Sequence, residues 1–252
     1  MQNRKKIAFW CCVSLFLGCI AFVIVKMTDH EQKTDIYEQM QETNEKLEQE
    51  IEKTEPDEET LIIPVDFAAL QQQNKDIYAW IRIEGTVVDY PIAQHPEDDS
   101  YYLNHTVEGK KGLPGSIYTE NYNKTDFTDR NTLIYGHDMK NGSMFGDLSK
   151  YKDSAYMQEH RQILIYTPEH IYTYQVFAAI TYDNRHIMYS FDFSTEEGMQ
   201  EFLDSLAGVR NMASYLDTSI EVTSADKMIT LSTCTGNSSQ RLLVGAVLVD
   251  EQ

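Results

Sequence analysis

Short runs of apolar, β-branched and aromatic residues recur along residues 61–252, and turn-forming residues separate most of them. The runs are TVVDYPI, GSIYTE, NTLIYG, RQILIYT, IYTYQVFAAI, KMITLST and RLLVGAVLV. Gly, Pro, Asn and Asp clusters lie between them, and TPEH at residues 167–170 has the composition of a hairpin loop. Seven or eight strands with few long helices predict a mostly β domain, either an antiparallel barrel or a sandwich.

Two helices are expected within this domain. The stretch VDFAALQQQNKDIYAWIRI predicts a short amphipathic helix followed by a strand that begins near Trp80. A second helix is expected at residues 194–208, between two late strands. Ser194 with Glu197 three residues later resembles a capping box, and apolar residues follow at helical spacing, namely Met199, Phe202, Leu203 and Leu206.

The N-terminal part of the chain contains a run of nineteen uncharged residues, 7–25. As a helix this run is about 28 Å long, close to the hydrocarbon thickness of a bilayer. Basic residues at positions 4–6 precede it, so the positive-inside rule predicts a cytoplasmic N-terminus at residues 1–6 and an extracellular location for the rest. A cleaved signal peptide is the alternative, but its apolar region is shorter, and no small-x-small cleavage site follows Val25. We therefore expect an uncleaved transmembrane signal-anchor at residues 7–25.

An acidic segment, residues 26–60, separates this run from the β-rich domain. From residue 27 to 60 it holds thirteen acidic residues against three lysines. Apolar residues recur at spacings of four and seven, which predicts a helical stalk that packs on the domain or spaces it from the membrane; they are Ile36, Met40, Leu47 and Ile51. Pro56 is expected to end this helix. A coiled-coil dimer has weaker support, because Thr43 and Asn44 lie in the seam.

The charge of the whole chain excludes one class of partner. Acidic residues outnumber basic ones 40 to 21, and the formal net charge is −19. Nucleic-acid binding requires clustered Lys and Arg. We therefore expect no nucleic acid as a partner.

Of the four cysteines, three lie inside the predicted membrane span at positions 11, 12 and 19, and only Cys234 lies in the exported part. A disulfide needs a pair, and a structural zinc site needs several Cys or His at close spacing. Neither requirement is met. The thiol of Cys234 is therefore either inert and buried or reactive.

Two residues are candidates to assist a reactive thiol. His137 directly follows the strand NTLIYG, at the point where a rigid strand gives way to a loop, whereas the other histidines lie in the stalk, in polar loops or beside turns. Arg241 begins the final strand, a short loop after Cys234. Antiparallel pairing of these two strands would place Cys234 and Arg241 side by side, where a guanidinium can donate hydrogen bonds to a developing oxyanion.

These residues together resemble the sortases, membrane-anchored cysteine transpeptidases of Gram-positive bacteria. The shared features are TLSTC at the end of a strand, an Arg at the start of the next, YGH upstream, and an N-terminal anchor. The blocks NKDIYAWIRIEGTVVDYPIAQ, YYLNH, GSIYTENYN and LIYGHDMKNGSMFGDLSKY, with the late helix, are similar to class B sortases over nearly all of residues 65–249. Two features depart from that pattern: Asp138 follows the His, where Asn or His is frequent, and the loop from Cys234 to Arg241 is short.

The resemblance implies an eight-stranded sortase-type β-barrel at residues 61–252 and three catalytic residues. Cys234 would form a thioacyl-enzyme after Thr of a C-terminal sorting motif, His137 would transfer protons, and Arg241 would hold the oxyanion or the motif. Leu103 and Ser232 match positions near the bound peptide, although Leu103 has core packing as its alternative. The implied partners are surface proteins with a sorting motif, an amine of a peptidoglycan cross-bridge or lipid-linked precursor, and the cell membrane.

No cofactor is implied, because an amide is exchanged for an amide. We also expect no required metal, since the sequence contains no D-x-[DN]-x-[DN]-G calcium loop. Three alternatives remain open at this point: a sortase that polymerises pilins, a cysteine peptidase that releases its product to water, and a binding domain in which Cys234 is inert. The sequence does not indicate which sorting motif is recognised.

Overall fold

The computed structural model describes residues 2–53 and 61–252, and it divides into two compact units, one up to Met40 and one from Gln41 to Gln252. The first unit is the greater part of the helix α1 (Gln2–Lys53). Among the described residues, no helix is long and apolar enough to cross a membrane. Many side chains of the predicted span, residues 7–25, lie outside what the structure describes, as does Pro56.

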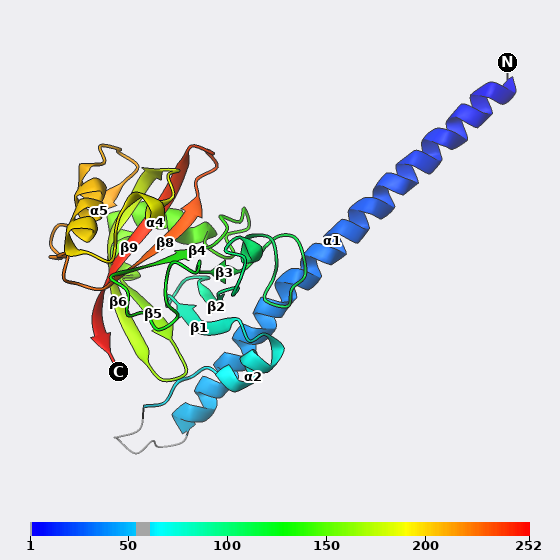
Figure 1. The fold of residues 1–252 in the computed structure, drawn as a ribbon. Coiled ribbons are helices and arrows are strands. Elements are labelled where there is room, and N and C mark those ends of the chain that lie inside the picture. The colour runs from blue at the N-terminus through cyan, green and yellow to red at the C-terminus, as the bar shows by residue number, and fades with distance from the viewer. Residues whose placement is uncertain (1, 54–60) are drawn as a thin grey trace. The chain divides into compact units, whose positions relative to one another are not determined.

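The second unit is built around a closed β-barrel (Figure 1). Eight strands pair in the order β5-β1-β2-β3-β4-β8-β9-β6, and β5 also pairs with β6, which closes the circle. A ninth strand of two residues, β7, pairs with β6 outside this circle. The strands are β1 (Ile77–Arg82), β2 (Asp89–Ala93), β3 (Ile117–Tyr118), β4 (Asn131–Tyr135), β5 (Gln162–Tyr166), β6 (Ile171–Asp183), β7 (Tyr215–Leu216), β8 (Met228–Cys234) and β9 (Gln240–Glu251). The eight-stranded barrel is confirmed, and the sandwich is excluded.

The purely antiparallel arrangement expected from the sequence is wrong. β2 pairs with β3 in parallel, and β4 pairs with β8 in parallel. Parallel neighbours need a long crossover connection, and both pairs have one, since residues 94–116 join β2 to β3 and residues 136–227 separate β4 from β8. The hairpin between β5 and β6 is confirmed, with residues 167–170 as its loop.

Short helices occupy the connections. They are α2 (Phe67–Gln73), α3 (Ser154–Glu159), α4 (Ile187–Ser190) and α5 (Glu196–Gly208), with 3-10 helices η1 (Tyr101–Leu103) and η2 (Gly146–Lys152). The expected helix before the strand near Trp80 is confirmed as α2, and that strand, β1, begins three residues earlier than expected. The inserted helix between two late strands is confirmed as α5.

The start of α5 differs from the expected one by one residue. Thr195 is the N-cap, and its Oγ1 accepts a hydrogen bond from Gly198 N at 3.1 Å. The hydroxyl of Ser194 instead donates to Asp192 Oδ1 at 2.6 Å. Because that local turn occupies Ser194, the next hydroxyl residue caps the helix.

Helix α5 packs through its apolar face against the barrel. Met199, Phe202 and Leu206 are buried in one cluster with Phe177 and Ile180 of β6. A stripe at spacings of three and four on a polar helix predicts this contact, and burial of such side chains stabilises it by about 1.5–3 kcal/mol each. The helix is thereby fixed beside the barrel, between β6 and β8 in the sequence (Figure 1).

The C-terminal part of α1, from Gln41 onward, packs on the barrel rather than standing apart from it. Gln41 Nε2 donates to the carbonyl oxygen of Asp89 at 2.6 Å, and Glu48 pairs with Arg82. Arg82 also donates from Nε to Asp89 Oδ1 at 2.9 Å. Of the two roles considered for the stalk, packing on the domain is therefore observed for this part of the helix.

Asp217 connects its own loop to residues 158–161 beside the barrel. Its Oδ2 accepts hydrogen bonds from Arg161 at 2.8 Å and from Gln158 at 3.0 Å, and its Oδ1 accepts two from Ser219. The hydrogen bonds from Ser219, followed by those of its other partners, lower the pKa of the Asp217 carboxyl. The charged carboxylate is therefore the form that the fold stabilises.

We expect Asp217→Ala to reduce the free energy of unfolding by about 2 kcal/mol at pH 7, because charged hydrogen-bond partners are left unpaired. A group with a depressed folded pKa contributes its stability above its unfolded pKa, near 4, and loses it as the pH falls through the folded value. The difference between the two proteins should shrink below about pH 4. Denaturant unfolding at pH 7 and at pH 3.5 measures this, with the exposed Asp204→Ala as control. An equal difference at both pH values would contradict the prediction.

Candidate active site

Cys234 and Arg241 lie side by side at one end of the barrel. Cys234 is the last residue of β8, and the antiparallel register pairs it directly with Arg241 of β9. This is the pairing that the sequence predicts. Cys234 is exposed and is a free thiol, and Arg241 is half-buried. An exposed thiol at a strand end is accessible to a substrate, so the inert buried alternative is excluded on exposure.

The short loop between these two residues is a compact turn. Gly236 has φ +79, a conformation that favours glycine, and Asn237 Oδ1 accepts hydrogen bonds from the backbone N and the hydroxyl of Ser239. Asn184 Nδ2 donates to the carbonyl oxygen of Ser238 at 3.1 Å. The turn is thus held to the segment that follows β6.

The parallel pairing of β4 with β8 brings His137 to the same end of the barrel. Tyr135 is the register partner of Ser232, and the pairing continues past the strand, since Gly136 N donates to Ser232 O at 3.2 Å and Thr233 Oγ1 donates to Gly136 O at 2.7 Å. His137 is the next residue after Gly136, and Cys234 is the next residue after Thr233. The structure therefore places all three residues predicted to be catalytic at the same end of the barrel.

The imidazole of His137 is oriented by a backbone carbonyl. His137 Nε2 donates to the carbonyl oxygen of Leu103 at 2.7 Å, because a carbonyl can only accept. The backbone of His137 is fixed as well, since its carbonyl accepts from Phe145 N at 3.0 Å. With the proton on Nε2, the other ring nitrogen, Nδ1, is the one available for proton exchange.

The two residues predicted to contact the peptide, Leu103 and Ser232, differ in exposure and in location. Leu103 ends η1, and the residue is 40% exposed, so the alternative of core packing is wrong. Its carbonyl is in direct contact with the His137 ring. Ser232 is buried, lies two residues before Cys234 on the same face of β8, and lines a cavity together with Arg241.

That cavity, of about 150 Å³, lies between the starts of β9 and α4 and is lined by both polar and apolar side chains. Its wall includes Glu120, Tyr135, His186, Ser232 and Arg241. Glu120 Oε2 accepts a hydrogen bond from Tyr135 Oη at 3.1 Å and lies 3.0 Å from His186 Nε2. Burial raises the pKa of the Glu120 carboxyl, while the nearby His186 acts in the opposite direction.

The sequence did not single out Glu120 and His186 as site residues. Glu120 follows the run GSIYT, and His186 is one of the histidines that lie beside turns. Glu120 lies two residues after β3, as His137 lies two residues after β4, and His186 lies directly before α4. Because 66 positions separate them in the sequence, only the closed barrel shows that they meet.

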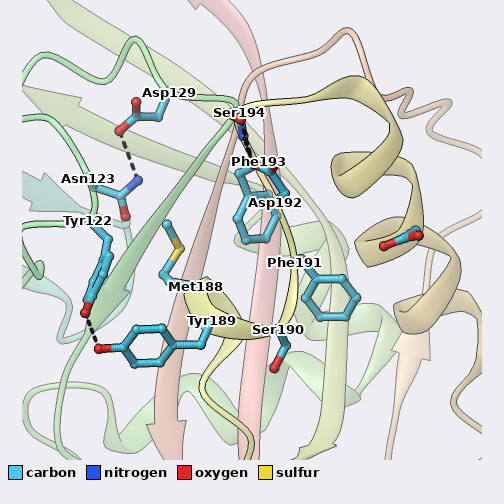
Figure 2. A pocket seen from close by; sticks show the side chains of 11 residues that line it. Tyr122, Asn123, Asp129, Met188, Tyr189, Ser190, Phe191, Asp192, Phe193 and Ser194 are labelled. Carbon is cyan, nitrogen blue, oxygen red and sulfur yellow. Dashed lines mark hydrogen bonds between the residues drawn. The ribbon is translucent and has the colours of Figure 1, made fainter.

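A second and larger cavity of about 710 Å³ shares α4 with the first (Figure 2). Figure 2 shows the hydroxyl groups of Tyr122 and Tyr189 directed toward each other, with Met188 beside them. The ring of Tyr189 also lies 4.2 Å from that of His186, centroid to centroid. This aromatic contact connects the walls of the two cavities.

Gly115 lies where the backbone approaches His137 closely. It has φ +68, and a Cβ added there would lie 2.8 Å from the Leu103 carbonyl oxygen and 3.1 Å from Cδ2 of His137. We expect Gly115→Ala to displace the Leu103 carbonyl and the His137 ring and to lower kcat by about tenfold or more, if His137 is catalytic as the sequence predicts, since small misplacements of a catalytic group are costly. Steady-state ligation kinetics measure this. The matched control is Gly208→Ala, where an added Cβ meets nothing within 4 Å, and equal effects at both positions would contradict the prediction.

A family model and two characterised relatives match this chain in sequence. A family model described as the sortase domain matches residues 81–249. Sortase B of Listeria monocytogenes is 38% identical over 167 residues, which cover 66% of this chain and 65% of that protein, just under two thirds. Sortase B of Staphylococcus aureus is 30% identical over 186 residues, which cover 73% of this chain and 74% of that protein.

Solved structures agree in fold. A Staphylococcus aureus sortase B–substrate complex superposes with a TM-score of 0.72 at 27% identity, covering 87% of this chain and 97% of the other. A sortase B complexed with triglycine has the same TM-score and identity, with coverages of 87% and 98%. The barrel, the strand-end thiol and these similarities lead to one conclusion. The chain belongs to the sortase family, in its class B branch.

Proposed function

We propose that this sortase cleaves a C-terminal sorting motif of exported proteins after Thr, forms a thioacyl-enzyme on Cys234, and transfers the protein to an amine of the cell wall. The observation that supports this proposal best is the meeting of Cys234, Arg241 and His137 at one barrel end. A nucleophile, a cation and a proton carrier are the three groups that acyl transfer through a thioester needs.

The first half of the reaction forms the thioester. The Cys234 sulfur, as the thiolate, attacks the Thr carbonyl carbon, and the guanidinium of Arg241 donates hydrogen bonds to the oxyanion. The C–N bond then breaks, and His137 as imidazolium gives its proton to the departing amine. The Leu103 carbonyl, which accepts from Nε2, orients the ring for this transfer from Nδ1.

The second half resolves the thioester. An acceptor amine attacks the thioester carbon and gives a proton to His137, the C–S bond breaks, and the thiolate and imidazolium are restored. An amide has been exchanged for an amide, so the reaction needs no cofactor. The carbonyl of Leu103 contacts the His137 ring, and Ser232 precedes Cys234 by two residues and lines the cavity with Arg241, so we assign both residues to the peptide-binding groove.

The partners follow from the same reasoning. The substrate complex of the Staphylococcus aureus relative supports a protein with a sorting motif as acyl donor. The structure of a sortase B complexed with triglycine supports a peptide amine as acceptor. We propose a peptidoglycan cross-bridge or a lipid-linked precursor as the source of that amine.

We also propose that residues 7–25 anchor the chain in the cell membrane, with the N-terminus cytoplasmic and the barrel outside. The support is the nineteen-residue uncharged run with basic residues before it. Membrane fractionation, followed by protease treatment of intact cells, tests this. Release of the chain by high salt, or full protection of the barrel from protease, would overturn the proposal.

One assay tests the activity. The full chain is incubated with a labelled panel of sorting-motif peptides, with and without triglycine, and the Cys234→Ala variant serves as control. Ligation that depends on triglycine and is absent in the variant is expected. Equal cleavage without amine would instead indicate a peptidase, and the absence of both thioester and cleavage would indicate a binding domain. Replacing triglycine with a lysine side-chain amine distinguishes a pilin polymerase.

A further inference from the structure

Glu120 lies in the wall of the cavity that also contains Arg241. It follows β3 by two residues, and its side chain is only 15% exposed. A carboxylate this deep in a wall is costly unless partners stabilise its charge. The hydrogen-bond partners of Glu120 therefore indicate which chemical group the cavity can bind.

Only one of the two carboxylate oxygens of Glu120 is occupied. Both the hydroxyl of Tyr135 and His186 Nε2 approach Oε2, at 3.1 and 3.0 Å. Within residues 2–53 and 61–252, Oε1 has no hydrogen-bond partner. One acceptor oxygen is thus held in place by two donors, and the other remains available to a third.

The two arginines that line the cavity do not pair with Oε1 of Glu120. Arg185 is held by Asp183, to which it donates from both Nε and Nη2, and Arg241 donates from Nη1 to the carbonyl oxygen of Gln240. The remaining charged neighbour, Asp99, is another carboxylate and raises the pKa of Glu120 further. The cavity therefore presents an acceptor at the Glu120 wall and a donor at Arg241.

The size of the cavity limits what can enter it. A volume of about 150 Å³ corresponds to about five water molecules, or to one side chain, rather than to a length of peptide. A single side chain of the substrate that lies beside the reacting carbonyl is the group that fits these dimensions.

We propose that Glu120 is a specificity-determining residue, whose Oε1 accepts a hydrogen bond from one donor side chain of the sorting motif, an ammonium or a carboxamide. Tyr135 and His186 are positioning residues that hold Oε2 and so direct Oε1 toward the cavity. This assignment rests on the proposed transpeptidase function, in which a sorting-motif peptide occupies the groove beside Arg241.

The test uses full-length enzyme, triglycine and peptides in which each position before Thr carries in turn Lys, Gln, Met or Glu. At one position, wild-type kcat/KM for Lys and Gln is expected to exceed that for Met by about tenfold or more, with Glu lowest. In Glu120→Gln, kcat/KM for the Lys peptide should exceed that for the Glu peptide by no more than about threefold. The Gln peptide should still be accepted. Glu120→Ala should remove the preference for Lys and Gln over Met.

Matched variants separate specificity from structure. Glu84→Gln removes an exposed carboxylate outside the cavity and should leave every ratio unchanged. His186→Gln keeps a donor amide for Oε2 and should retain the preference, whereas His186→Ala should lose it.

The outcomes that would overturn the inference are distinct from failure of the proposed function. A wild-type enzyme that ligates without preference for a donor at any position excludes the specificity role. So do Glu120 variants that keep the wild-type ratios, or that slow all peptides by one common factor. Absence of ligation by the wild-type enzyme with every peptide would overturn the proposed function itself.

Discussion

Replacing His137 with alanine is expected to lower kcat/KM for amine-dependent ligation by about a thousandfold, within the range for loss of a general acid–base group. Both halves of the proposed reaction move a proton through this ring. Its Nε2 is committed to the Leu103 carbonyl at 2.7 Å, so Nδ1 carries the exchange. The half-buried ring fills little of the core, and the fold should therefore be unchanged.

Single-turnover thioester formation and steady-state ligation, measured between pH 5 and 9, test this expectation. The variant should be slow in both measurements across this pH range. His170→Ala is the matched control, because that histidine is exposed in the β5–β6 hairpin and outside the site. A loss of less than tenfold, or an equal loss in the control, would exclude His137 as the proton carrier.

The contact between Cys234 and Arg241 was predictable from the sequence because it is local. Two apolar runs separated by a short polar turn pair as antiparallel neighbours, and the turn length sets which residues face each other. The eight-stranded barrel was predicted from the family resemblance, since alternating apolar runs alone do not separate a barrel from a sandwich.

The position of His137 at the same end of the barrel as Cys234 depends on a feature that sequence patterns do not show. β4 and β8 pair in parallel although 92 residues separate them. A strand pattern indicates which face is buried but not which distant strand is its neighbour or in which direction it runs. The meeting of Glu120 with His186 was missed for the same reason, because each residue alone resembles an ordinary surface residue.

Arg241→Lys is expected to lower kcat by about a hundredfold with a much smaller change in KM. The variant keeps the positive charge, but a lysine ammonium cannot reproduce the planar set of donors of a guanidinium. Arg241 is the register partner of Cys234 and lines the cavity beside it, so its donors are close to the carbonyl under attack. An interaction made mainly with the oxyanion affects the chemical step more than substrate binding.

Rapid-quench measurement of thioester formation separates the chemical step from binding, and peptide binding to a Cys234→Ala background gives the affinity directly. Arg185→Lys is the matched control, since that guanidinium lines the same cavity but is held by Asp183. If Arg241 holds the oxyanion, only its own substitution slows acylation, while peptide affinity is preserved. If Arg241 instead holds the motif in the ground state, affinity falls and kcat does not, and the oxyanion role would be excluded.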